Sequence, residues 1–230
     1  MFKVTVLVLV CFGMAAADFS DDFESFSPGD DISSSPSWDK APVGGDAVVI
    51  EQSGNNCVNA VFSDSSFIGY VCTAAGIWKN GSVAMDFSPS GAGSFSNVYA
   101  RLNPVSSDAY AAGLTVFMGT LTYQYIAYIK SEGNYEVLYS GMGPQISPGE
   151  WANVKLQVEG ADPVTLTLYI NGEQAAQAVD TNYLLQEGIC GFALYYEGDE
   201  PSILMDNFEV IANPLSLAET SFGALKAMFR

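Results

Sequence analysis

The stretch VKLQVEGADPVTLTLYING, residues Val154 to Gly172, decides the fold class of this chain. Its apolar residues recur at every second position on both sides of residues 160–163, at Val154, Leu156, Val158, Val164, Leu166, Leu168 and Ile170. A period of two sends successive side chains to opposite faces, which is typical of β-strands with one buried face. Asn171-Gly172 then fits a tight hairpin turn, where both central residues need a positive φ. The stretch predicts consecutive antiparallel strands.

The same pattern of short apolar runs and turn residues extends outward over Asp46–Val210. Gly133-Asn134 is predicted as a turn, and Asn80-Gly81 as a second tight hairpin. Between Asp18 and Asn213 no segment of helical length has a 3.6-residue apolar period. We therefore expect an all-β protein, a two-sheet antiparallel β-sandwich of the jelly-roll type, with one domain at 18–212. Further strands are expected at Val48–Gln52, Val58–Ser63, Phe67–Cys72, Val83–Phe87, Ser96–Leu102, Leu114–Met118, Tyr123–Lys130, Tyr135–Tyr139, Ile189–Tyr195 and Ile203–Val210.

The two ends of the chain differ from this domain. Residues 1–17 have the parts of a signal peptide: Lys3, an apolar run over Val4–Phe12, and small residues at 15–17. The run is shorter than the roughly 20 residues that span a bilayer. We expect a secreted protein, extracellular or at the cell surface, with the periplasm as an alternative and no membrane insertion after cleavage. Residues 213–230 are a C-terminal tail, either a short amphipathic helix or a sorting segment.

Composition excludes several classes of function. Eight Lys and Arg residues against 26 Asp and Glu give a formal charge of −18, which repels nucleic acids and anionic membranes. The chain contains no histidine, which excludes Ser-His-Asp and Cys-His catalysis and His-ligated zinc. Catalysis by carboxylate, Tyr or Lys side chains is not excluded by the composition.

Removal of the signal peptide leaves an odd number of cysteines, Cys57, Cys72 and Cys190. At most one internal bridge is then possible. Cys57 and Cys72 lie on successive predicted strands with a short connection, so they are the predicted disulfide pair. The alternative is three buried thiols that act as small hydrophobic side chains.

Four segments resemble the concanavalin A-like lectin/glucanase group, which includes laminin-G-like extracellular domains. They are WANVKLQV from Trp151, LTLYING from Leu166, GICGFALYY from Gly188 and MDNFEV from Met205. The resemblance covers the last third of the domain, whereas the N-terminal half matches only in strand spacing. It implies the sandwich fold rather than one activity, because this fold hosts lectins, adhesins, glycosidases and lyases.

Asp206 is the first candidate site residue. Counting in twos places it on the face of Phe208 and Val210, the expected buried face, where an unpaired carboxylate is costly. In the resembling jelly-roll domains a final-strand aspartate meets first-strand acids at a structural calcium. The resemblance thus implies a calcium site formed by Asp22, Glu24 and Asp206. The alternative is that the first-strand acids are merely solvated.

The chain lacks the Glu-x-Asp-x-x-Glu cluster that β-glucan-cleaving members of this fold carry, and Glu197, Asp199 and Glu200 come closest in a predicted loop. Aromatic residues are the remaining signal, and Tyr123, Gln124 and Tyr125 are the predicted carbohydrate contacts, with burial in the core as the alternative. We expect a non-catalytic carbohydrate-binding or adhesion module whose partner is a polysaccharide or glycan. The alternatives are a polysaccharide hydrolase or lyase with scattered carboxylates, and a structural envelope or matrix protein.

Overall fold

A computed structural model describes residues 18–41, 44–62, 67–90, 93–118, 120–130, 134–196 and 202–212. These residues form fifteen β-strands and one short 3₁₀ helix, η1 (Ile32–Ser34), which Asp31 caps by accepting a hydrogen bond from the Ser33 N–H. The described residues contain no α-helix, and none of their helices is long and apolar enough to span a bilayer. The expectation of an all-β chain is confirmed. The predicted signal peptide at 1–17 and tail at 213–230 lie outside the described residues.

One layer of the sandwich is an eight-stranded antiparallel sheet. The segment from 152 to 180 forms three neighbouring strands of it, and Asn171 (φ 53°) and Gly172 (φ 79°) make the tight turn predicted between two of them. The strand order is β13 (Glu173–Asp180), β12 (Val164–Ile170), β11 (Ala152–Gly160), β6 (Gly81–Pro89), β15 (Ile203–Ala212), β4 (Asn55–Val61) and β3 (Asp46–Gln52), and β1 (Phe19–Asp21) pairs with β15.

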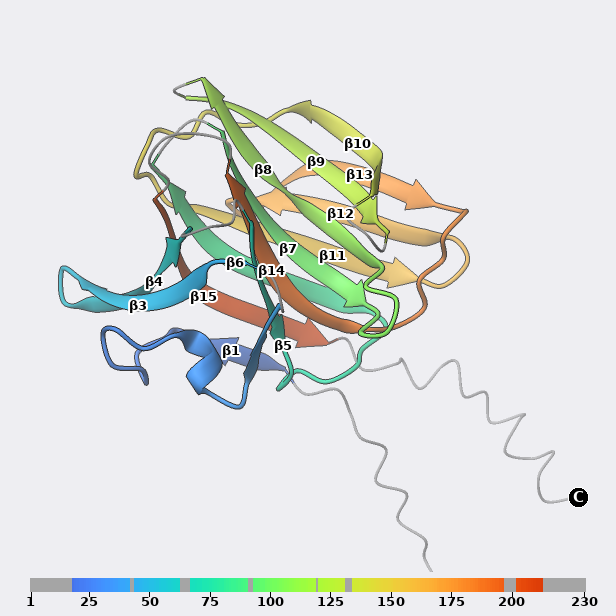
Figure 1. The fold of residues 1–230 in the computed structure, drawn as a ribbon. Coiled ribbons are helices and arrows are strands. Elements are labelled where there is room, and N and C mark those ends of the chain that lie inside the picture. Colours follow the sequence, from blue (N-terminus) through green and yellow to red (C-terminus); the bar gives the residue numbers. More distant parts are fainter. Residues whose placement is uncertain are drawn as a thin grey trace, which may run out of the picture.

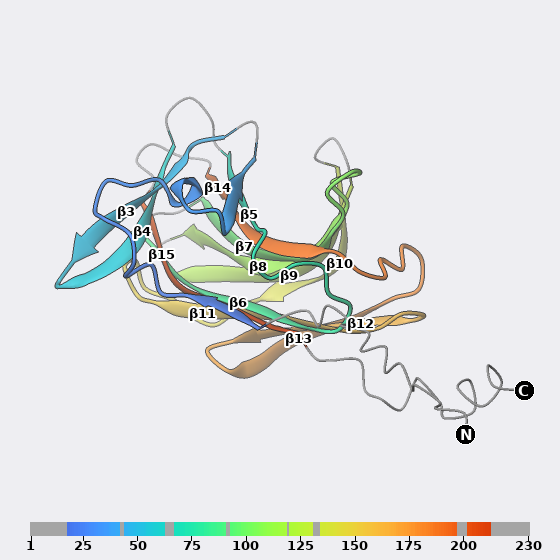
Figure 2. The same ribbon diagram turned by 90° about the horizontal axis from the view of Figure 1, so that it is seen from below.

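The other layer is a seven-stranded antiparallel sheet, and Figures 1 and 2 show the two layers stacked face to face. Its strand order is β10 (Tyr135–Met142), β9 (Leu121–Ile129), β8 (Ala109–Met118), β7 (Ser94–Leu102), β14 (Ile189–Tyr196), β5 (Phe67–Cys72) and β2 (Trp38–Lys40). Neighbours in this order come from distant parts of the chain: β14 lies between β5 and β7. The two-sheet sandwich predicted from the sequence is confirmed.

The core lies between the two sheets and is filled by the inward half of each strand. The alternating apolar residues of β11 and β12 belong to it, each with 4% or less of its surface exposed. Trp38 joins the two layers, because its ring contacts Phe208 on the eight-stranded sheet at 4.8 Å and Phe192 on the seven-stranded sheet at 5.6 Å between centroids. Its indole N–H donates to Asp21 at 2.9 Å, which satisfies the polar group of this buried side chain.

The predicted hairpin at Asn80-Gly81 is wrong. β5 and β6, which flank it, belong to different sheets, so the chain crosses from one layer to the other there. The Asn80 side-chain oxygen instead accepts hydrogen bonds from Arg101 Nη2 at 3.1 Å and from the Gly160 N–H at 3.1 Å. The Asn80 side chain thus bridges Arg101 on β7 and Gly160 at the end of β11, and no hairpin forms at this position.

Candidate functional site

Alternation along the strands gives the seven-stranded sheet an outer face that does not touch the core. On β7, Val98 and Ala100 lie in the core, so Asn97 and Tyr99 between them point to the opposite side. Ala111 on β8 is buried but is not part of the core cluster, as expected for a small residue covered by larger side chains on the outer face. This outer face is the first candidate surface.

A row of side chains, four of them aromatic, crosses this face from strand to strand, and we call it the aromatic row. The strand register aligns Met142, Tyr123, Thr115, Phe95, Tyr195 and Phe67 in that order on six neighbouring strands. The rings of Phe95 and Tyr195 meet edge to face with their centroids 5.6 Å apart. Five strand spacings of about 4.8 Å give the row a length of about 24 Å, which is long enough for several sugar rings.

Beside the aromatic row lie residues with little or no side chain, which we call the small-residue floor: Gly69, Ala111, Gly113, Gly191 and Ala193. Gly113 has a specific reason to be glycine. A Cβ there would lie 2.1 Å from the Ser96 carbonyl oxygen and 2.5 Å from Asn97 Oδ1. The floor residues are themselves buried, because neighbouring side chains cover them. The Phe67 ring lies over Gly69, where an added Cβ would be 2.8 Å from the ring.

Tyr99 and Tyr125 border the floor and keep their hydroxyl groups protonated. Burial raises the pKa of Tyr99 to about 12. Burial, followed by the neighbouring Tyr99 and Tyr135, raises the pKa of Tyr125 well above its ordinary value. The Tyr125 hydroxyl donates to Asn97 Oδ1 across Gly113. These groups are neutral hydrogen-bonding partners at physiological pH.

The structure separates the three residues predicted to contact carbohydrate. Tyr123, which is 45% exposed, and Tyr125 both lie on the outer face, because they are two positions apart on β9. Gln124 is a correction: it points inward, is 5% exposed and donates from Nε2 to the Ala175 carbonyl at 2.9 Å. A ligand on the aromatic row cannot reach it.

Phe95, Tyr195 and Phe67 are the candidate contacts that were missed from the sequence. Each sits at a strand position out of phase with the core residues, and this signal is readable from the alternation. What cannot be read is that these three strands are neighbours, because β14 lies between β5 and β7 although it follows them by about 90 residues or more.

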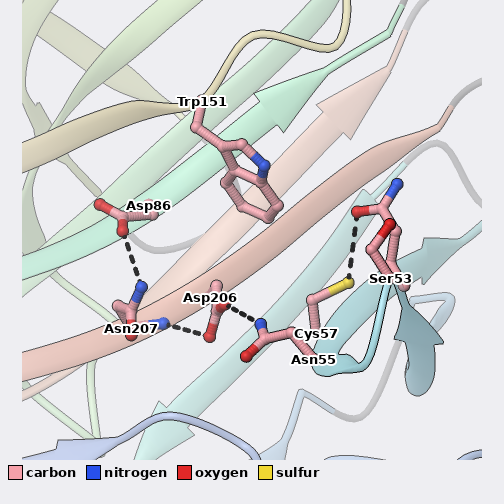
Figure 3. Close-up of a pocket in the computed structure, with 8 residues that line it drawn as sticks. Ser53, Asn55, Cys57, Asp86, Trp151, Asp206 and Asn207 are labelled. Carbon is pink, nitrogen blue, oxygen red and sulfur yellow. Dashed lines mark hydrogen bonds between the residues drawn. The ribbon is translucent and has the colours of Figure 1, made fainter.

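A second candidate surface is a shallow hollow of about 360 Å³ on the eight-stranded sheet (Figure 3). Trp151 is 39% exposed and its ring overhangs the hollow, so it is not a core residue. Two carboxylates lie below it and are both held by amide groups. The hollow is lined by Gln52, Ser53, Asn55, Cys57, Asp86, Trp151, Asp206 and Asn207.

Asp206 faces this hollow and not the core, which corrects its predicted placement on the face of Phe208. A β-bulge between Asp206 and Glu209 places Asn207 in the left-handed region (φ 51°) and shifts the alternation by one residue. Asp206 accepts hydrogen bonds from Asn55 Nδ2 at 2.9 Å and the Asn207 N–H at 2.8 Å. Burial, then the charges of Asp86 and Glu24, raise the pKa of Asp206 above its ordinary value.

The structure does not gather the three predicted calcium ligands into one set. Asp22 lines a neighbouring hollow with Ser20 and Glu209, whereas Asp206 lines the first. Glu24 is near enough to affect Asp206, but its Oε1 accepts a hydrogen bond from the Asn56 N–H at 2.9 Å. Among the described residues, no three His, Cys, Asp or Glu side chains form a group that could hold a metal ion. These three side chains do not fit a calcium site as they are arranged, and bound calcium at Asp206 stays a prediction.

Melting curves check that prediction directly. If Asp206 is a calcium ligand, millimolar calcium relieves its repulsion with Asp86 and raises the Tm of the protein by a few degrees relative to EDTA, since about 1 kcal/mol shifts Tm by about 2–4 °C at this size. The Asp206→Ala variant then melts at the same temperature in calcium and in EDTA. An unchanged Tm of the unmodified protein in calcium and in EDTA contradicts the prediction.

The predicted Cys57–Cys72 disulfide is wrong. β4, which carries Cys57, belongs to the eight-stranded sheet, whereas β5, which carries Cys72, belongs to the seven-stranded sheet. Cys57 faces the hollow, where its sulfur lies 4.0 Å from Gln52 Oε1. All three cysteines in the described residues are buried free thiols, which agrees with the alternative stated above.

Comparison with known proteins supports the architecture. No family model matches the sequence, and no curated protein matches it. Solved structures do match the fold. A carbohydrate binding module, CBM66, from Bacillus subtilis is 15% identical with a TM-score of 0.54, and the match covers 75% of this chain and 93% of that one. The Bacillus licheniformis beta-glucanase is 13% identical with a TM-score of 0.55, and the match covers 85% of this chain and 98% of that one.

A third similar structure is a Bacillus subtilis protein of unknown function with a galectin-like fold. It is 16% identical with a TM-score of 0.52, and the match covers 80% of this chain and 92% of that one. At this level of identity the likeness establishes the fold. The chain has the concanavalin A-like jelly-roll fold of lectins and glucanases, and the resemblance read from its sequence is confirmed at that level.

Proposed function

We propose that this protein is a secreted, non-catalytic module that binds a neutral polysaccharide along the aromatic row of the seven-stranded sheet. The row itself carries the proposal: four aromatic rings and Met142 stand in register across six strands, beside a floor of glycine and alanine. Aromatic rings present apolar faces that suit the C–H faces of sugar rings.

The polar groups at the edge of the row suit sugar hydroxyls. Tyr99 and Tyr125 are partly exposed, and their hydroxyl groups stay protonated at neutral pH, since burial raises the pKa of both. Asn97 is 7% exposed and already accepts from the Tyr125 hydroxyl. Among the similar structures, one is described as a carbohydrate binding module and another as a beta-glucanase. A carbohydrate ligand therefore agrees with both the surface and the fold.

Binding is favoured over hydrolysis because the central strands of this face carry no acids in their described parts, and the outward Asp39 lies on the edge strand β2. A glycosidase needs a pair of carboxyl groups on the two sides of the scissile bond. In the described parts of β5, β7, β8, β9 and β14, the outward positions carry no Asp or Glu. The acids at 197, 199 and 200 lie outside the described residues. The hollow with Asp86 and Asp206 is the weaker candidate, because it offers one aromatic ring and its carboxylates already accept amide hydrogen bonds.

The charge of the protein favours a neutral ligand. The chain carries a formal charge of −18, and the outward positions of the aromatic row include no Lys or Arg. Pectins, alginates and sulfated glycans are polyanions, and they would be repelled without a local cation. An uncharged polysaccharide meets no such repulsion.

A retention assay tests this proposal. The full-length protein is incubated with insoluble neutral polysaccharides, including β-glucan, fructan, xylan and chitin, and with anionic polymers as the matched control. We expect retention by at least one neutral polymer, none by the anionic polymers, and no release of soluble sugar. Retention by anionic polymers alone, or release of sugar during the incubation, contradicts the proposal.

A further inference from the structure

Two cysteines face each other across a strand pair although neither was predicted to pair with the other. The register of β14 and β5 places Cys190 directly opposite Cys72, and both side chains are fully buried on the inner face of the seven-stranded sheet. The two thiols are close enough to act on each other, and this interaction is the largest influence on the pKa of each. Cys57 is on the other sheet and cannot take part.

We propose that Cys72 and Cys190 are a disulfide-forming pair, oxidised when the protein folds in an oxidising compartment. Directly opposite residues of an antiparallel pair have Cα atoms about 4.5–5.5 Å apart. Disulfides form over Cα separations of about 4.4–6.8 Å. The bond therefore forms without moving the two strands apart or together, by rotation of two short side chains at directly opposite positions.

The chemistry requires an oxidant, and the class we name is another disulfide, such as oxidised glutathione. The Cys72 thiolate attacks one sulfur of that disulfide, forms a mixed disulfide and releases one thiolate. The Cys190 thiol then loses its proton and displaces the second thiolate, which leaves the Cys72–Cys190 bond. Two protons and two electrons leave the protein, and the glutathione disulfide becomes two thiols.

In the folded protein the two thiols differ in acidity. The interaction with Cys190, together with N–H donors of Ala74 and Ala75, lowers the pKa of Cys72 against the effect of burial. The interaction with Cys72 and burial raise the pKa of Cys190. Because both side chains are buried in the folded protein, exchange takes place as the strands pair and before the core closes.

The bond fastens the strands that carry two of the four aromatic rings in the aromatic row. Phe67 on β5 and Tyr195 on β14 are opposite each other on the outer face, five residues along from the cysteines on each strand. The disulfide also closes a loop of about 120 residues, so it restricts the unfolded chain strongly. The oxidised protein is therefore expected to be much more stable than the reduced one.

Peptide mapping tests the proposal. The full chain is unfolded, reduced and refolded with reduced and oxidised glutathione, and free thiols are then alkylated in denaturant without reduction. Chymotrypsin cleaves after Phe62 and Phe67, which separates Cys57 from Cys72. We expect a peptide containing Cys72 bonded to one containing Cys190, with Cys57 alkylated. Full alkylation of Cys72 and Cys190, or a bond between either of them and Cys57, overturns the proposal.

Melting of the same refolded protein gives a second measurement. Breaking the bond with a reductant is expected to lower the Tm on the order of 10 °C. The Cys57→Ser variant, the matched control, keeps this sensitivity, whereas Cys72→Ser and Cys190→Ser melt at the same temperature with and without reductant. If the two serine variants do not fold, the change in Tm that reductant causes in the unmodified protein and in Cys57→Ser still tests for the bond. An unchanged Tm on reduction of both overturns the proposal.

Discussion

Replacement of Arg101 by methionine is expected to lower the free energy of unfolding by about 4 kcal/mol. Arg101 is fully buried, yet none of the ion pairs among the described residues includes it. Burial lowers the pKa of Arg101 to about 10, so the side chain remains charged at neutral pH. A charged group in this position is tolerated only because its donors are satisfied.

The guanidinium group of Arg101 holds several separate segments of backbone together. Nε donates to the Lys79 carbonyl at 2.6 Å, Nη2 donates to the Gly160 carbonyl at 2.7 Å, and Nη1 donates to the Leu185 carbonyl. Nη2 also donates to Asn80 Oδ1 at 3.1 Å. Methionine fills much of the same space but has no donor, so these acceptors lose their partner. Each buried unsatisfied acceptor costs about 1–3 kcal/mol, and partial access of water lowers the sum.

Urea unfolding followed by tryptophan fluorescence measures this loss. The matched control is Lys155→Met, which removes a cation from the outer face of the eight-stranded sheet, where Lys155 lies 4.5 Å from the Tyr169 ring centroid. We expect a change of at most about 1 kcal/mol for this control. Equal losses in Arg101→Met and Lys155→Met contradict the role assigned to Arg101.

The second large effect concerns the ligand. The double variant Phe95→Ala, Tyr195→Ala is expected to bind its polysaccharide about 100-fold more weakly, because loss of two stacking rings at about 1.5 kcal/mol each is about 3 kcal/mol. These rings meet edge to face at the middle of the aromatic row. Contacts near the centre of a binding surface contribute most of its affinity.

Tyr169→Ala is the matched control for this double variant. Tyr169 is also an outward aromatic residue, but it lies on the eight-stranded sheet, on the opposite side of the sandwich. It is expected to leave the affinity for the same polysaccharide unchanged, as measured by isothermal titration with a soluble oligosaccharide. Circular dichroism confirms that each variant is folded. Equal affinity of the double variant and the unmodified protein places the ligand elsewhere.

The fold was predictable from the sequence because its strongest signals are local. The alternation on β11 and β12 and the Asn171-Gly172 turn depend on neighbouring residues alone, and all three are found in the structure. The candidate site depends on which strands lie side by side, and that is decided by long-range packing. The sequence therefore identified Tyr123 as a candidate contact from its own strand. It did not identify Phe95 and Tyr195, which join Tyr123 in the aromatic row only when the strands pair.

Two of the errors share one physical cause, which is a break in the pattern that local counting assumes. The bulge at Asn207 moved Asp206 to the outer face, since one extra residue reverses the alternation. The change of sheet between β4 and β5 separated Cys57 from Cys72, although they are 15 positions apart in the chain. Neither a bulge nor a crossing between layers leaves a reliable mark in a single sequence.

Retention of three forms of the protein on the neutral polysaccharide found in the panel tests the central claim most directly. The unmodified protein, the double variant Phe95→Ala, Tyr195→Ala and the variant Trp151→Ala are sedimented in parallel with that polymer. A ligand on the aromatic row predicts that the unmodified protein and Trp151→Ala are retained equally and that the double variant stays in solution. Retention of the double variant together with loss of Trp151→Ala would contradict the account and assign binding to the hollow on the other sheet.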